Sequence, residues 1–317
     1  MNEQIEQQAK VPETLAGKRL DQIAARVFPD FSRARLQIWI KEGKLKVNDH
    51  PGKAKDKLAA GDHLHIIASL EAEGDWVAEP LPLNIVYEDA DLLVLNKPAG
   101  LVVHPASGHP TGTMLNGLLH HHPELKNVPR AGIVHRLDKD TTGLLVVAKT
   151  LSSHHALVEQ LQQRQVSREY EAIVQGVLTG GGTVDAPIGR HPKNHKKQAV
   201  NERGKEAITH YRVITRFRRH THIGIRLETG RTHQIRVHSA HIKHPITGDP
   251  IYAGRRRQPA NISSQLATAL QKFQRQALHA CRLTLTHPGS GKSMTWQAPL
   301  PEDFTALLNT LQQDMEN

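Results

Sequence analysis

A carboxylate stands among basic and hydroxyl side chains in one short stretch of the sequence. Within GIVHRLDKDTTGLLVVAKT (132–150), Asp138 follows His135 and Arg136 and precedes a Thr-Thr-Gly turn. Apolar runs of strand character flank it, so we expect the carboxylate in a loop at a strand end, where rigid sheets commonly present reactive groups. Such a carboxylate can act as a nucleophile or as a general base. The same pattern also suits a salt-bridged turn.

Hydrophobic periodicity indicates the elements that must hold this loop. Strands are expected at 91–98, 143–149, 168–178 and 221–228. Helices are expected at 152–164, 232–242 and 302–312. Between Ile188 and His220, ten basic residues stand against two acidic ones, which indicates a basic loop or hairpin, or simply a solvated run of charge. The chain as a whole is expected to adopt an α+β fold.

Composition favours a polyanionic partner. The 317 residues carry a formal net charge of +10 and 38% hydrophobic residues, so a core can form and phosphate-rich ligands are attracted. No apolar run is long enough to span a bilayer, and the polar start MNEQIEQQAK does not resemble a signal peptide, so we expect a cytoplasmic protein without a membrane partner. Cys281 is the single cysteine, which excludes an intrachain disulfide.

The N-terminal part has the pattern of a separate module. Two short amphipathic helices are expected within 18–41 and two strands near 45–48 and 61–67. From Lys18 to Lys57 there are eleven basic and five acidic residues, whereas 58–96 has eight acidic residues and no Lys or Arg. We therefore expect an N-terminal tail at 1–17, a first domain at 18–75, a linker at 76–83 and a second domain at 84–317.

Four long motifs in order resemble one family, the pseudouridine synthases of the RluA type. They are NKPAGLVVHP (96–105), GIVHRLDKDTTGLLVVAK (132–149), SREYEAIVQG (167–176) and LETGRTHQIRVH (227–238). The segment 18–48 is similar to the S4 RNA-binding domain. The resemblance implies an S4-like α/β domain followed by a catalytic domain whose mixed, largely antiparallel sheet is flanked by helices. Thr142 stands where the family commonly has serine, a mild departure.

The resemblance also implies a reaction and its residues. Asp138 matches the essential aspartate, Tyr170 the tyrosine that packs on the target base, and Arg231 the basic residue paired with the carboxylate. Arg136 matches the arginine that enters the RNA stack when the base leaves it. Further RNA contacts are expected from Arg33, Arg35, Lys44, His135, Thr232, Gln234 and Arg236.

The implied function is site-specific isomerisation of uridine to pseudouridine in large-subunit (23S) ribosomal RNA or its precursor particles, by a monomer. The reaction breaks the N-glycosidic bond, rotates the uracil and joins its C5 to the sugar. Since no atoms are gained or lost, no metal or other cofactor is expected. The nucleotide must be flipped out of the RNA, at a cost of a few kcal/mol.

Two other readings compete. A non-catalytic RNA-binding ribosome assembly factor would explain the charge, although not the ordered motifs. A metal hydrolase is suggested by the 22 histidines, but the sequence has no HExxH motif and its single cysteine cannot form a Cys-rich site. HPGSGKSMT (287–295) resembles a phosphate-binding loop, yet Thr286 stands where that motif needs glycine and a strand is expected to follow.

Overall fold

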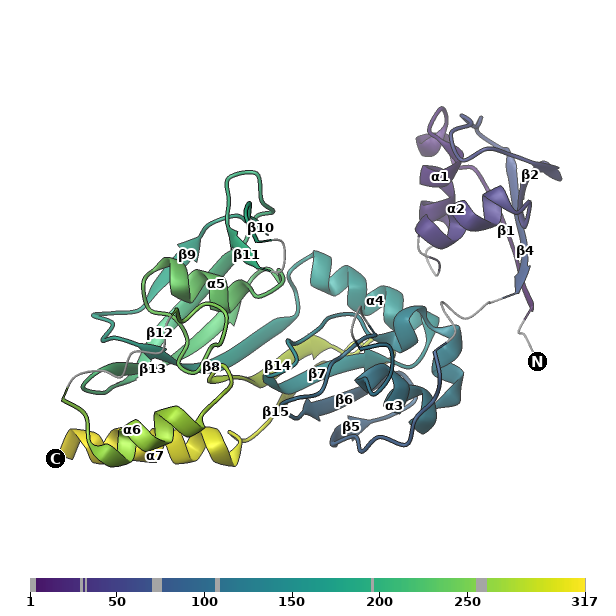
Figure 1. The fold of residues 1–317 in the computed structure, drawn as a ribbon. Helices are drawn as coiled ribbons and strands as arrows, with labels where there is room; N and C mark the ends of the chain where they lie inside the picture. Colours follow the sequence, from purple (N-terminus) through teal and green to yellow (C-terminus); the bar gives the residue numbers. More distant parts are fainter. Residues whose placement is uncertain are drawn as a thin grey trace.

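The computed structural model describes residues 4–28, 31, 33–69, 76–105, 109–194, 197–254 and 261–316 (Figure 1). Its strands form a four-stranded sheet near the N-terminus, a nine-stranded sheet in the remainder, and a two-stranded hairpin. The predicted boundary between residues 75 and 76 falls at the segment 70–75, which lies outside the described residues.

The N-terminal unit packs two helices on a small sheet. Its elements are β1 (Gln4–Lys10), α1 (Leu20–Val27), α2 (Arg33–Lys41), β2 (Leu45–Val47), β3 (His50–Pro51) and β4 (His63–Ser69). The core contains Leu20 and Ile23 of α1, Leu36 and Trp39 of α2, and Ile66 of β4. These apolar positions recur at helical spacing in the helices, which is why both helices pack their apolar face on the sheet.

The prediction of a separate tail at 1–17 is wrong. β1 pairs antiparallel with β4 over seven residue pairs, whereas β2 pairs with β4 over three. Val11 and Leu15, within the same segment, are buried in the core of this unit. The alternation of apolar and polar residues in QIEQQAK is too weak for a strand to be predicted without its partner.

The larger sheet is mixed and mostly antiparallel. Its strands are β5 (Ile85–Glu88), β6 (Leu92–Lys97), β7 (Thr142–Ala148), β8 (Ser167–Gln175), β9 (Gly182–Asp185), β12 (Ile208–Arg216), β13 (His220–Leu227), β14 (Leu278–Thr286) and β15 (Ser293–Gln297). They follow the order β5-β6-β7-β14-β8-β13-β12-β9, with β15 beside β14. Among the described strands only β7 and β14 pair in parallel.

Among the described residues, five α-helices accompany this sheet: α3 (Met114–His121), α4 (Leu151–Gln162), α5 (Gln234–His241), α6 (Ser264–Lys272) and α7 (Glu302–Glu316). In Figure 1, α6 and α7 run together along one side of the sheet, and α5 lies beside the hairpin of β10 (Ile188–Arg190) and β11 (Gln198–Val200). Every residue of β7 is buried, as expected for a strand covered on both faces.

The pairing of β10 with β11 shows that the basic region between Ile188 and His220 contains a hairpin, one of the two structures expected for it.

Glycine permits the close approach of β7 and β14. Gly143 has φ 113°, and a Cβ at this position would collide with the backbone of Ala280. Beside it, the Oγ1 of Thr142 lies 2.8 Å from Nδ1 of His279 on β14. The turn that follows Asp138 is thus attached directly to the centre of the sheet. In the part of the chain that is described, no helix is long and apolar enough to cross a bilayer.

The pairing of β1 with β4 predicts the effect of a truncation. Deletion of residues 1–10 leaves one edge of β4 without a partner, so the amides that face β1, those of Leu64, Ile66 and Ala68, are expected to exchange hydrogen faster. Amides of β8 in the larger sheet serve as the internal control and keep their protection. Unchanged exchange in β4 would show that β1 does not pair with it in solution.

Candidate active site

The loop that carries Asp138 opens into a pocket of about 730 Å³. This volume lies within the roughly 300–1,000 Å³ usual for small-ligand sites. The pocket brings together residues from four of the long sequence motifs, including the three predicted catalytic residues Asp138, Tyr170 and Arg231. Five predicted RNA contacts also line it: His135, Arg136, Thr232, Gln234 and Arg236.

The buried side chain of Lys97 anchors the backbone of the Asp138 loop. Lys97, at the end of β6, is 1% exposed, and its Nζ donates to the carbonyl oxygens of Pro98, Leu101 and Lys139. Burial lowers the pKa of Lys97 to about 7, while the charges of Asp140 and Asp138 oppose this shift. One buried ammonium therefore ties the residue after Asp138 to the preceding motif.

The partner of Asp138 is Arg236. Nη1 of Arg236 donates to Oδ2 of Asp138 at 2.8 Å, while Nε and Nη2 donate to the two carboxylate oxygens of Asp249 at 2.7 and 2.9 Å. Burial alone would lower the pKa of Arg236, but its hydrogen bonds to Asp249 and Asp138 raise it above the ordinary value. The guanidinium is thus permanently charged and fixed between two carboxylates.

The prediction that Arg231 pairs with Asp138 is therefore wrong. Arg231 lies on the pocket wall, where its Nε donates to the carbonyl oxygen of Glu206 at 2.9 Å. It precedes α5, whereas Arg236 lies inside that helix and is buried. The prediction that Arg236 contacts RNA is corrected by the same geometry, because its side chain is 4% exposed and its guanidinium is occupied by the two carboxylates.

Asp249 and Tyr252 support this arginine. The Asp249 side chain is fully buried and also accepts hydrogen bonds from the backbone N–H groups of Ile251 and Tyr252. The guanidinium of Arg236 lies over the Tyr252 ring, 5.1 Å from its centroid, in the geometry of a cation–π contact. The pocket therefore depends on a turn that follows α5 and that no sequence motif marked.

His233 lies between Tyr252 and Asp138. The Tyr252 hydroxyl accepts from the backbone N–H of Gln198 at 2.9 Å, and it lies 2.8 Å from Nδ1 of His233. Nε2 of the same imidazole lies 3.7 Å from Asp138 Oδ1. Burial lowers the pKa of His233, although the Asp138 charge opposes this.

Gln234 has no free hydrogen-bonding capacity for RNA, which corrects its predicted role. Its Oε1 accepts from Thr229 Oγ1 and from the backbone N–H of Arg231, and its Nε2 donates to Ile208 O and Thr209 Oγ1. The residue is 3% exposed. Gln234 instead joins the start of α5 to β12 and to the loop before the helix.

Tyr170 and His135 form the inner part of the pocket. Burial raises the pKa of Tyr170, and the charges of Arg168 and Asp138 act on it in opposite directions. His135 Nε2 accepts from the backbone N–H of Val146 at 3.1 Å. Burial, reinforced by the charge of Arg168, lowers the pKa of His135 to about 3, so its imidazole is neutral near pH 7. A neutral ring that braces β7 is better placed to shape the pocket than to contact phosphate.

Other predicted RNA contacts lie at the surface. Arg136 and Thr232 are exposed at the pocket and remain accessible to a ligand. Arg33, Arg35 and Lys44 belong to the N-terminal unit and do not line this pocket. Arg33 is half-exposed and donates to the fully buried carboxylate of Asp21 at 2.6 Å, so part of its role is structural.

Sequence reasoning missed four pocket residues or their supports. Asp249 and Tyr252 lie beyond the last motif, and His233 and Arg168 lie inside motifs without being singled out. A basic residue at an apolar-facing position of a strand, as Arg168 is in β8, was the available signal for one of them. The other three depend on the turn after α5, which periodicity does not describe.

The arrangement suits chemistry at a carboxylate that is largely buried and whose charge is balanced by an arginine. Asp138 is held by a fixed guanidinium, its side chain is 17% exposed, and an aromatic ring lies in the same pocket. Such a carboxylate can attack an electrophilic carbon or take a proton. The ring of Tyr170 offers a flat apolar surface to a planar ligand.

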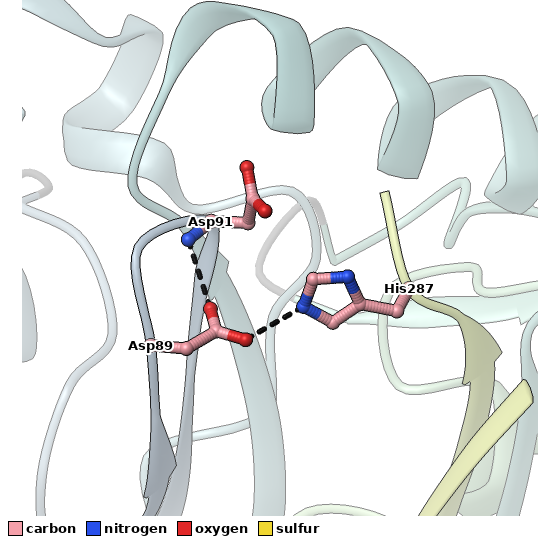
Figure 2. A group of neighbouring side chains, drawn as sticks. All are labelled: Asp89, Asp91 and His287. Atoms are coloured by element: carbon pink, nitrogen blue, oxygen red, sulfur yellow. Dashed lines mark hydrogen bonds and ion pairs between the residues drawn. The ribbon is translucent and has the colours of Figure 1, made fainter. Parts of the chain in front are cut away.

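A second cluster, Asp89, Asp91 and His287, has the donor types of a metal site (Figure 2). Its hydrogen bonds give another explanation. His287 Nδ1 accepts from the backbone N–H groups of Gly289 and Ser290, so the proton is on Nε2, which donates to Asp89 Oδ2 at 2.7 Å. That oxygen also accepts from the Tyr87 hydroxyl. Metal binding through Nε2 would require the opposite tautomer, so the cluster acts as a tie between the β5–β6 and β14–β15 turns.

Substitution of two arginines on the same motif separates their roles. Arg236→Met leaves the buried Asp249 without a counter-charge and is expected to lower the free energy of unfolding by about 3–5 kcal/mol. Arg231→Met removes one side-chain hydrogen bond and is expected to lower it by about 1 kcal/mol or less. Chemical denaturation of both variants measures the difference, and equal losses would contradict the assignment of Arg236 as the central partner.

Acid titration tests how much the hydrogen bonds of the Asp89 carboxylate stabilise the fold. Burial would raise the pKa of Asp89, but hydrogen bonds from Leu92, Tyr87, Asp91 and His287 lower it from 3.8 to about 2. The carboxylate thus stabilises the fold above pH 3.8, and this contribution is lost as the pH falls towards 2. Asp89→Asn is expected to cost about 1–2 kcal/mol at pH 7, with the difference from wild type vanishing near pH 2.

Asp185→Asn, at an exposed aspartate of β9, serves as the control and leaves stability unchanged at both pH values. Addition of Zn²⁺ is expected to leave the melting temperature of the wild type unchanged. A rise in melting temperature with Zn²⁺ that Asp89→Asn abolishes would show that the cluster binds metal after all.

Comparison with known proteins places this geometry in a family. Residues 91–241 match the model of the RNA pseudouridylate synthase family. The chain is 58% identical over 316 residues to ribosomal large subunit pseudouridine synthase D of Pseudomonas aeruginosa, covering 100% of this chain and 99% of that protein. It is 51% identical over 317 residues to the protein of the same name from Escherichia coli, covering 100% and 97%.

Two solved human structures share the fold. RNA pseudouridylate synthase domain containing 4 superposes with a TM-score of 0.55 at 28% identity, over 72% of this chain and 93% of that chain. RNA pseudouridylate synthase domain containing 1 gives a TM-score of 0.53 at 22% identity over 74% and 96%, which supports the fold alone. With full-length relatives above 50% identity and a family model that matches residues 91–241, the chain belongs to the RNA pseudouridylate synthase family and is a pseudouridine synthase.

Proposed function

We propose that this pseudouridine synthase isomerises specific uridines of large-subunit ribosomal RNA, with Asp138 as the catalytic carboxylate. The relatives named above are large-subunit ribosomal enzymes by name and align with the whole chain. The observation that carries the catalytic assignment is the position of Asp138, held by Arg236 in a pocket that Tyr170 also lines.

The pocket geometry supports a base-flipping mechanism. A uridine inside an RNA fold hides its glycosidic bond, so the nucleotide must leave the stack to reach a recessed carboxylate. Tyr170 then packs on the flipped uracil. Arg136, exposed beside the pocket, fills the vacated position in the RNA stack with its planar guanidinium.

Asp138 starts the reaction in one of three ways: it adds to the base, adds to the sugar carbon, or removes a sugar proton. Each route uses the same unprotonated oxygen. Arg236 holds Oδ2 of Asp138, which leaves Oδ1 as the oxygen free to react, and Nε2 of His233 lies 3.7 Å from Oδ1. The protein's own side chains thus orient the carboxylate without any added group.

The N-terminal unit is proposed to hold the RNA outside the pocket. Its S4-like sequence pattern and its basic residues, among them Arg33, Arg35 and Lys44, suit recognition by shape and phosphate contacts. We place its limits at the start of β1 and at residue 75, the linker at 76–83 and the catalytic domain at 84–317.

One chain contributes all the pocket residues named above, so we further propose that the enzyme acts as a monomer. Its site of action would be the cytoplasm, where large-subunit precursor particles assemble. A non-catalytic assembly factor is the second candidate, because the basic surface alone would serve it. That alternative does not explain why Arg236 and the buried Asp249 hold the carboxylate of Asp138 in the pocket.

Replacement of the carboxylate tests the proposal. Asp138→Asn is expected to abolish isomerisation while RNA binding is largely retained, because the basic contacts remain in place. Unmodified rRNA or precursor particles are incubated with each protein, and pseudouridine is mapped by carbodiimide labelling and primer extension. Asp140→Asn removes a carboxylate from the same loop and is expected to keep most of the activity.

New stops with wild type and Asp140→Asn alone would support the proposal and identify the uridines. If wild type bound the RNA but made no stops on any precursor particle, the assembly-factor alternative would replace it. Stops with Asp138→Asn would remove that residue from the chemistry.

A further inference from the structure

Arg168 is a buried cation without a partner. It lies in β8, is 8% exposed and lines the pocket. Its Nε is enclosed, and in the part of the chain that the structure describes no hydrogen bond or ion pair involves this side chain. An unpaired buried guanidinium is unfavourable, because it has lost water without gaining a compensating acceptor.

The other buried arginines of the described chain do not share this property. Arg236 pairs with Asp138 and Asp249, and Arg275 pairs with Asp303 at 2.7 Å. The fold thus satisfies buried guanidinium groups where they serve packing. Arg168 differs from them in facing the reaction pocket with its donors unused, which points to a ligand as the missing acceptor.

The guanidinium lies deep in the pocket, beside the base-stacking tyrosine. Arg168 and Tyr170 are two residues apart on one strand, so both point to the same face, and both are buried. Nη1 of Arg168 lies against the loop between β13 and α5, where a Cβ added at Gly230 would come within 2.7 Å of it. The charge of Arg168 acts on the pKa of both His135 and Tyr170, so the guanidinium lies near each of them. Arg136, by contrast, is exposed.

The proposed reaction generates a negative charge at this depth. If the N1–C1′ bond breaks heterolytically, its electron pair stays on the uracil, and Asp138 balances the sugar by bonding to C1′ or by taking a proton from it. If Asp138 adds to C6 instead, the ring electron pair moves onto a carbonyl oxygen. On that route too, the N1–C1′ bond then breaks with its electron pair remaining on the ring. After rotation C5 bonds to C1′, the bond to Asp138 is broken or the removed proton is returned to the sugar, and the ring loses the proton on C5 and gains one on N1. Every route passes through a uracil ring that carries negative charge.

We propose that Arg168 is a further catalytic residue, whose guanidinium donates hydrogen bonds to a carbonyl oxygen of the uracil as the ring becomes anionic. This inference rests on the proposed function of the pocket. The uncharged uracil of the substrate gains less from a cation than the anionic ring does. The contact therefore strengthens as the reaction proceeds, which is the condition for lowering the barrier rather than only tightening binding.

The test compares Arg168→Gln and Arg168→Lys with Arg226→Gln, an exposed arginine on the neighbouring strand β13 that does not line the pocket. Two quantities are measured with an rRNA fragment that wild type modifies: the single-turnover rate constant at saturating enzyme, and the Kd for the RNA. Arg168→Gln is expected to slow the single turnover by about 10²–10³-fold, the effect of losing one oxyanion donor. Its Kd should stay within about threefold of wild type, Arg168→Lys should be intermediate, and Arg226→Gln should match wild type.

A raised Kd with an unchanged rate constant at saturation would place the guanidinium on a backbone phosphate and overturn the proposal, as would unchanged values of both. The melting temperature without RNA gives an independent readout. Removal of an unpaired buried charge should leave it equal to or above wild type, and a large fall would show that Arg168 is structural. If wild type modifies no isolated rRNA fragment, the rate constant and the Kd are measured with the precursor particles used above, and inactivity on those particles would overturn the proposed function itself.

Discussion

The site depends on one guanidinium held between two carboxylates. Arg236 contacts Asp138 in a loop before β7 and Asp249 in a turn after α5, so it joins segments that are about a hundred residues apart in the chain. Because Asp249 is fully buried and anchored by backbone N–H groups, it fixes Arg236, and Arg236 in turn fixes one oxygen of Asp138. The second oxygen accepts no hydrogen bond from Arg236. The same pair of contacts both stabilises the fold and orients the carboxylate of Asp138.

A second level of constraint acts on the backbone of the Asp138 loop. The Lys97 ammonium holds the carbonyl of Lys139 from one side, while Gly143 allows β7 to approach β14 from the other. His135 braces β7 through the N–H of Val146. The loop is therefore irregular but not free to move, which is how a short connection can present a carboxylate reproducibly.

The sequence predicted most of the large elements and the loop that carries Asp138, because both leave local patterns. β7 is a continuous apolar run and α5 follows the expected spacing, so their types could be predicted. The choice of Arg231 over Arg236 failed because it depends on which residue the start of α5 turns towards the sheet. The burial of Gln234 and the β1 pairing failed for a similar reason, since tertiary partners decided them. Arg168 carries no local signal of an unpaired charge, which only the folded pocket reveals.

The strand order also governs when the pocket comes into existence. β14 starts at Leu278 of 317 residues, yet it lies between β7 and β8 at the centre of the sheet. The Asp138 loop belongs to the half that contains β7, whereas Tyr170 lies in β8 on the other side of β14. During synthesis, β7 and β8 each remain an unpaired edge strand until β14 is made and inserts between them. Strand pairing over such a long distance in the sequence is slow. A chain that ends before β14 has every motif of the active site and no active site, and its two unpaired edges favour aggregation.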